Sequence, residues 1–95
     1  MNLALLRYVK SFSEGRVRIR HPAVHNAATA EIVQKGILAT KGVNSVEINT
    51  LSGSILILYD ATLLAKNQLI EMGIAWADYL DKVKAGKDAE PPHFA

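Results

Sequence analysis

The sequence predicts an α+β fold in which an antiparallel sheet carries two helices on one face. Two segments, 16–20 and 46–49, alternate apolar and polar side chains, as half-buried strands do. A third, 55–59, is apolar throughout, which indicates a strand with apolar groups on both faces. Two further segments, 27–40 and 69–83, carry apolar residues at helical spacing. With 95 residues, of which 49% are hydrophobic, the chain suffices for one small core.

The N-terminal segment, residues 1–14, is left unassigned. An apolar residue recurs at every third position, which is a weak helical spacing, whereas Tyr8 and Val9 equally fit the start of a strand. The apolar run near the start is broken by Arg7 and is too short for a signal peptide or a membrane-spanning helix. We therefore expect a cytoplasmic protein.

The first predicted strand, residues 16–20, places Val17 and Ile19 on one face and three arginines on the other. Pro22 ends this strand, because proline has no N–H for the ladder and disfavours helical angles in the residue before it. Asn26 is then the expected N-cap of the first helix.

The first helix is expected to span residues 27–40, followed by a cationic last turn at Lys41 and a glycine, Gly42, at the C′ position. Segment 55–59 is the expected central strand of the sheet. Asp60 to Thr62 can end that strand and cap the second helix.

This order of elements is most of a ferredoxin-like βαββαβ unit, a two-layer sandwich with both helices on one face of the sheet. Its last strand would have to come from residues 74–80, whose alanines and Asp78 are poor strand formers. We expect a lengthened second helix there instead. The domain is predicted to cover residues 15–84, and residues 85–95 to form a flexible C-terminal tail because they are rich in Gly, Pro and charge.

Composition excludes several kinds of chemistry. The chain has no cysteine, which removes disulfides, thiolate zinc sites, cysteine-held iron–sulfur clusters and thiol nucleophiles. No nucleophile elbow, paired carboxylates or phosphate-binding glycine loop is present in the sequence, so we predict that the protein is not an enzyme. The net charge is only +2, but all four arginines lie within the first fifth of the chain.

The same frame resembles the heavy-metal-associated domain of copper and zinc chaperones and transport ATPases. The residues that carry the resemblance are Gly42-Val43, Val46-Glu47-Ile48, Tyr59-Asp60 and Met72-Gly73. The nearest likeness is to the cysteine-free second family of these domains, through residues 15–22 and 51–54. The resemblance covers roughly residues 15–73 and implies the ferredoxin-like fold.

In the metal-binding branch of this family, a Cys-x-x-Cys pair spans the loop after the first strand and the start of the first helix. Those positions fall near Asn26 and Thr29 here, and neither is a thiolate. A copper(I) chaperone role is therefore not expected, because soft sulfur ligands select that ion.

Two histidines, His21 and His25, bracket the same loop, and Asn26 follows them. Imidazole is a ligand for zinc, iron, nickel, copper(II) and haem iron, so these three residues are the candidate metal site, with a transition metal ion or haem as cofactor. Two histidines leave a metal short of ligands unless Asn26, Glu31, His93 or a second protomer contributes. The competing interpretation is that both are loop residues with no site.

The open sheet face is the second candidate. It combines Arg16, Arg18 and Arg20 with one apolar row of the central strand. The sequence does not decide which of two rows faces outward. The two rows are Ile55, Ile57 and Tyr59, or Leu56 and Leu58. We take Ile57 and Tyr59, with the arginines, as partner-binding residues.

An exposed apolar row needs cover. A homodimer, the N-terminal segment, the Trp76-bearing helix extension or haem could supply it. The charges fit an acidic protein or an anionic membrane surface. An RNA-binding sheet needs stacking aromatics, and only Tyr59 is available, which argues against nucleic acid.

Two functions follow. The first is a small non-enzymatic domain that carries or senses a transition metal or metal cofactor through histidines. The second is a metal-free interaction or regulatory module that uses the arginine-rich face.

Overall fold

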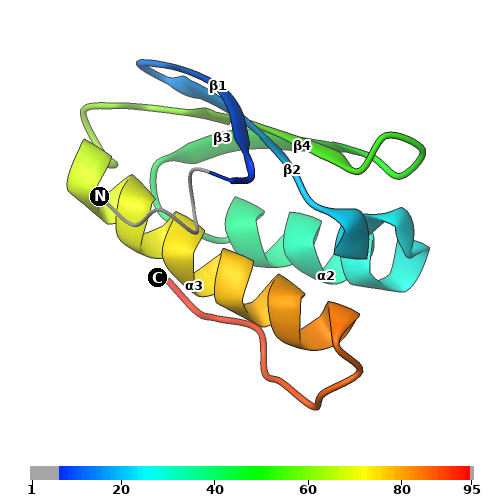
Figure 1. Cartoon of the computed structure of the whole chain (residues 1–95). Helices are drawn as coiled ribbons and strands as arrows, with labels where there is room; N and C mark the ends of the chain where they lie inside the picture. The colour runs from blue at the N-terminus through cyan, green and yellow to red at the C-terminus, as the bar shows by residue number, and fades with distance from the viewer. Residues whose placement is uncertain (1–6, 95) are drawn as a thin grey trace.

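The computed structural model describes residues 7–94 and shows two layers, an antiparallel sheet and two helices that both lie on one side of it (Figure 1). The elements in chain order are β1 (Val9–Ser13), β2 (Arg16–Arg20), η1 (Pro22–His25), α2 (Ala27–Leu38), β3 (Val43–Asn49), β4 (Ser54–Tyr59) and α3 (Lys66–Lys84). The predicted α+β, ferredoxin-like arrangement is confirmed. Neither α-helix in this part of the chain is long and apolar enough to cross a membrane.

The fourth strand of the sheet comes from the N-terminal side of the chain. β1 pairs antiparallel with β2 and forms one edge of the sheet. The register shifts between Val9 and Ser11, so Val9 lies opposite Ile19 and Phe12 lies opposite Val17. This bulge puts Val9 and Phe12 on the same face and breaks the alternation that marks a strand. The unassigned segment is therefore partly a strand whose sequence signal is hidden.

β4 is an inner strand, as its apolar sequence predicts. The strand order is β1-β2-β4-β3, which places β4 between β2 and β3. Ile55, Ile57 and Tyr59 face the helices and are at most 5% exposed. Leu56 and Leu58 point to the opposite face, where Leu58 is 38% exposed.

Asn26 caps α2 as predicted, but the helix ends at Leu38, two residues before the expected end. Gly42 does have a positive φ of 97°, yet it lies beyond the helix C-cap at Ala39 and turns the chain into β3. A Cβ at Gly42 would lie 3.0 Å from the Cβ of Leu64, so glycine also permits a close approach of the loop before α3. The predicted C′ role of Gly42 is thus corrected to a turn role.

α3 runs unbroken through residues 74–80, so the lengthened second helix is confirmed. Its buried stripe includes Leu69, Met72 and Trp76. Trp76 lies directly against α2, because a Cβ added at Gly36 would be 2.4 Å from the indole Cζ2 atom. The absence of a side chain at Gly36 therefore lets the two helices pack closely around the tryptophan.

Residues 85–94, after α3, have no regular secondary structure and return alongside the helix layer (Figure 1). The last described residues, Pro91 to Phe94, form a groove with α2. Ala89 and Phe94 pack against the core. The segment that follows residue 84 is thus only partly exposed, and the domain limits at 15 and 84 stay a prediction.

Candidate metal loop and open sheet face

The loop between β2 and α2 is organised by His21. Pro22 ends β2, and residues Pro22–His25 form η1, a 3-10 helix of about one turn. The Nδ1 atom of His21 accepts the backbone N–H of Ala23 at 3.0 Å and so caps this turn. Because Nδ1 accepts an N–H, it carries no proton, and the ring proton resides on Nε2.

The Nε2 atom of His21 is also engaged. It donates to Oδ1 of Asp81 on α3 at 2.9 Å, and the hydroxyl of Tyr8 donates to the same oxygen at 2.6 Å. The rings of Tyr8 and His21 lie 4.5 Å apart between centroids. His21 is 1% exposed. Through these contacts it joins the end of β2 to Asp81 of α3 and to Tyr8, which precedes β1.

The charges of this cluster follow from its hydrogen bonds. Partial burial raises the pKa of the Asp81 carboxyl, but the hydrogen bonds from Tyr8 and His21 outweigh burial and leave that pKa below its usual value. The hydrogen bond to Asp81, with a smaller effect of burial, raises the pKa of the Tyr8 hydroxyl. Asp81 is thus held as a carboxylate that accepts two hydrogen bonds from neighbouring side chains.

His25 has a different environment at the other end of the turn. It is exposed, and its Nδ1 atom lies 2.7 Å from the carbonyl oxygen of Thr50. A carbonyl only accepts, so Nδ1–H donates and the lone pair of Nε2 is left available. The ring lies over Gly53, where an added Cβ would be 3.3 Å from Nε2.

Asn26 and Thr29, near which the resemblance places the cysteine positions of the metal-binding branch, form a helix cap here. Oδ1 of Asn26 accepts the backbone N–H of Thr29 at 3.1 Å. Thr29 is buried, and Asn26 is exposed. The two residues satisfy the backbone at the start of α2, which is what an N-cap does.

The loop residues do not converge on one point. His21 faces Asp81, whereas His25 faces the β3–β4 turn and Asn26 faces the backbone of α2. Between residues 7 and 94, no three His, Asp or Glu side chains are grouped so that they could hold a metal ion. His93 lies elsewhere, on the groove between the tail and α2.

The open sheet face carries the arginine row in register with two leucines. Arg16 pairs with Leu58 and Arg18 with Leu56 across β2 and β4, and Glu47 of β3 flanks Leu56 on its other side. Both helices lie on the opposite side of the sheet (Figure 1). Arg20 completes the row next to Ser54.

The apolar row of this face is Leu56 and Leu58, which corrects the partner-binding set. Ile57 and Tyr59 are 1% and 5% exposed and pack in the core, so they cannot contribute to a surface. Trp76, considered as a cover for the open face, is 4% exposed within the helix layer. The strand β1 extends the sheet at its edge and does not cover the face.

The family to which the chain belongs is shown by its sequence. The heavy metal associated domain 2 family matches residues 6–90, which is most of the chain. The protein belongs to this family. No curated protein and no solved structure matches the chain. Association with heavy metals is the property that the family's description states. This heavy metal associated domain 2 protein has no cysteine that could serve as a soft metal ligand.

The sequence did not reveal Tyr8 and Asp81 as partners of His21. Tyr8 lies in the segment whose strand signal the bulge conceals, and Asp81 looks like any polar residue near the end of an amphipathic helix. The useful signal was the turn Ser13-Glu14-Gly15, in which Gly15 has a φ of 87°. Read as a hairpin, it would have placed Tyr8 beside the end of β2.

Proposed function

We propose that this protein is a non-catalytic metal-binding domain in which His25 is the metal ligand. The observation that carries the proposal is the orientation of the His25 ring, with Nδ1–H held by the Thr50 carbonyl and Nε2 directed away from that bond. Metal-ligating histidines commonly donate their second N–H to a carbonyl or a carboxylate, which fixes the tautomer and the ring orientation. His21 acts as a structural residue in this proposal.

One histidine supplies one ligand, so the remaining donors come from a second molecule. A second copy of the chain would contribute a second His25 and give a homodimer bridged by metal. Imidazole suits zinc, nickel and copper(II), and these are the ions to test. An open, shared site of this kind suits carriage or sensing of an ion, because the ion can leave without unfolding the domain.

Haem does not fit the histidine loop. His21 has both ring nitrogens engaged, and His25 is an exposed residue of a polar turn. The described residues do place one imidazole beside an apolar wall, where His93 lines the groove of about 520 Å³ between the tail and α2. A haem arm with a His93 variant therefore belongs in the test.

The test is titration of the untagged full chain with Zn²⁺, Ni²⁺ and Cu²⁺ by calorimetry, with the oligomeric state measured by light scattering. We expect about half an ion bound per chain together with dimer formation. His25→Ala should abolish both effects, whereas His93→Ala, which removes another exposed histidine, should leave them intact. Uptake that His25→Ala does not reduce, or no uptake of any of the three ions, contradicts the proposal.

The haem arm uses the same proteins. Haem is added to the full chain, to His25→Ala and to His93→Ala, and the Soret band is recorded. Our proposal expects no stoichiometric haem complex. A Soret band that disappears only in His93→Ala would instead assign a haem cofactor to the tail groove and would replace His25 as the ligand.

The second candidate function is an interaction module on the open sheet face. It is favoured by the register of Arg16 and Arg18 opposite Leu58 and Leu56, which puts a row of positive charges along one side of a small apolar strip that the helices do not cover. The partner that best complements such a surface is an acidic protein. An anionic membrane is the other partner that could supply negative charge.

Binding to vesicles with and without 30% anionic lipid tests the membrane source, and binding to an immobilised acidic peptide tests the protein source. Arg18→Glu should weaken either interaction, and Lys87→Glu in the exposed segment after α3 is the matched charge control. Equal loss in both variants would show that only net charge matters and would exclude a specific surface.

A further inference from the structure

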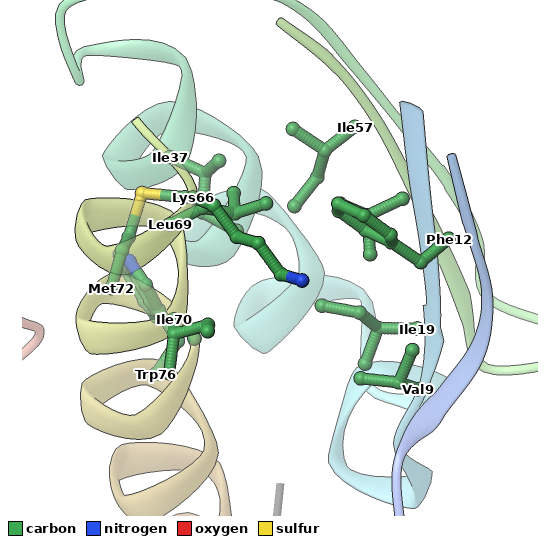
Figure 2. A pocket seen from close by; sticks show the side chains of 12 residues that line it. Val9, Phe12, Ile19, Ile37, Ile57, Lys66, Leu69, Ile70, Met72 and Trp76 are labelled. Carbon is green, nitrogen blue, oxygen red and sulfur yellow. The ribbon is translucent and has the colours of Figure 1, made fainter. Parts of the chain in front are cut away.

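An apolar cavity of about 180 Å³ lies between α3 and the β1–β2 hairpin, on the side of the sheet that the helices cover (Figure 2). Residues of the hairpin, including Val9 and Ile19, form one wall, and residues of α3, including Leu69 and Trp76, form the other. Figure 2 shows Val9 and Ile19 on the hairpin side of the gap and Leu69 and Lys66 on the α3 side. The cavity is distinct from the metal loop and from the open sheet face.

Three features of the fold leave this space. The bulge in β1 turns both Val9 and Phe12 toward the cavity. Trp76 packs against Gly36 of α2, which draws α3 toward α2. Gly73, on the cavity side of α3, presents no side chain, although glycine is a poorer helix former than alanine. The cavity thus lies beside Gly73, a residue type that disfavours the helix in which it stands.

The size of the cavity indicates what could fill it. An engineered apolar cavity of about 150 Å³ in another protein stays dry and binds benzene. An apolar group of about six carbons would regain the dispersion contacts that the empty walls lack. The whole of a haem would not fit, because ligands of drug size occupy pockets of about 300–1,000 Å³.

The mouth of the cavity carries a positive charge. Lys66, at the start of α3, is the one charged side chain among the described lining residues. Its Nζ atom lies 5.8 Å from the centroid of the Phe12 ring, and Figure 2 shows the side chain reaching from α3 toward the hairpin. Phe12 is 46% exposed, so the pair stands at the solvent edge. No ion pair between Lys66 and a carboxylate occurs within residues 7–94.

We propose that this cavity binds a small amphipathic carboxylate, with a hydrocarbon or aromatic group of about six carbons between α3 and the hairpin and the carboxylate at Lys66 Nζ. The apolar walls select the hydrocarbon part by removing it from water. Lys66 selects the anion over a neutral or cationic molecule of equal length. This inference does not rest on metal binding by His25.

The test uses the full chain and three probes of equal length, which are hexanoate, hexan-1-ol and hexylammonium. Trp76 borders the cavity, so its fluorescence reports occupancy, and amide NMR shifts locate the probe. Hexanoate should bind about two- to fivefold more tightly than hexan-1-ol, the range of an exposed charge pair, and hexylammonium should bind least. Lys66→Met should remove that preference, and Lys84→Met near the other end of α3 should keep it.

Filling the cavity supplies the second variant. Val9→Phe adds an aromatic ring on the exposed edge strand and should abolish binding of all three probes while the NMR spectrum stays that of a folded protein. If that variant does not fold, Lys66→Met alone still decides the role of the charge. Equal affinity for the three probes, or no binding of hexanoate by the wild-type chain, overturns the proposal. NMR contacts from Leu3, Leu5 or Leu6 to Trp76 that persist with hexanoate would assign the cavity to the chain's own N-terminus and also overturn it.

Discussion

His21 and His25 stand at the two ends of one 3-10 turn, and the fold gives them opposite environments. His21 is 1% exposed, with Nδ1 accepting from Ala23 and Nε2 donating to Asp81. His25 is exposed, and within residues 7–94 its one hydrogen bond is from Nδ1, as a donor to Thr50. The side that each histidine faces decides the difference, since one turns toward α3 and the other toward the β3–β4 turn.

The comparison teaches that a histidine becomes a ligand through what its second nitrogen does. A ring whose two nitrogens are both hydrogen-bonded stabilises the fold and must break a bond before it can bind a metal. A ring with one anchored nitrogen is already oriented for coordination. Four variants or measurements can break or sharpen this contrast, in order of the size of the effect on stability.

His21→Ala should lower the free energy of unfolding by about 2–4 kcal/mol, because it removes the cap of the 3-10 turn and a partly buried hydrogen bond to a charged group. Urea denaturation followed by circular dichroism measures it. His25→Ala is the matched control and should lower the same quantity by no more than about 0.5 kcal/mol. Equal losses in the two variants would abolish the contrast.

Asp81→Asn should cost about 0.5–1.5 kcal/mol at pH 7, because the amide oxygen still accepts but without the charge. The pKa of Asp81 is lower in the folded protein than in the unfolded chain. Stability from this carboxylate is therefore present above the ordinary Asp pKa of about 3.9 and is lost as the pH falls through the folded pKa. Urea denaturation between pH 7 and about pH 2 measures this loss.

The acid loss of stability should be smaller in Asp81→Asn than in the wild type. Asp88→Asn, in the exposed chain after α3, serves as the control and should keep the wild-type pH dependence. If Asp81→Asn loses stability on acidification as steeply as the wild type does, the carboxylate does not hold the His21 cluster together.

Tyr8→Phe should lower the free energy of unfolding by about 0.5–1 kcal/mol, since it deletes one hydrogen bond to Asp81 at a partly exposed site. The pKa of Tyr8 is raised in the folded state, so the unfolded chain loses this proton first and wild-type stability should decline above about pH 10. That alkaline contribution should be absent in Tyr8→Phe. Tyr79→Phe, which leaves the Tyr8 hydroxyl in place, is the control and should keep the alkaline decline. The same decline in Tyr8→Phe as in the wild type would refute the link.

The last measurement uses the wild-type protein and leaves its stability unchanged. When the imidazole rings are uncharged, His21 should be the Nε2–H tautomer and His25 the Nδ1–H tautomer. Long-range ¹H–¹⁵N NMR of the rings distinguishes the two tautomers. Zinc should then shift the His25 signals and leave those of His21 in place. Two rings with the same tautomer, or zinc shifts confined to His21, would reverse the assignment of the two roles.

Much of the fold was accessible from local pattern. The alternation of Val17 and Ile19, the unbroken apolar run of β4 and the Asn26 cap each depend on neighbours in sequence, so they could be predicted. β1 could not be assigned, because a bulge cancels the period of two on which strand prediction depends.

The candidate site was accessible in residue type but not in role. The sequence placed His21, His25 and Asn26 on one loop, and they do lie there. It offered Asn26 both as the N-cap of the first helix and as a metal ligand, and the structure shows the cap. It could not tell that Leu56 and Leu58, not Ile57 and Tyr59, would face outward. A strand with apolar groups on both sides gives no sign of which side meets the helices.

By itself, the sequence determined the order of most elements, the family, and the loss of every thiolate ligand, because periodicity, caps and composition are local properties of a chain. Only the tertiary structure decided that Asp81, sixty residues after His21, would occupy that histidine's free nitrogen, and that a cavity would remain under the hairpin. Contacts between distant segments depend on how whole elements pack, and a bulge or a glycine at one position changes that packing without a signal in its neighbours.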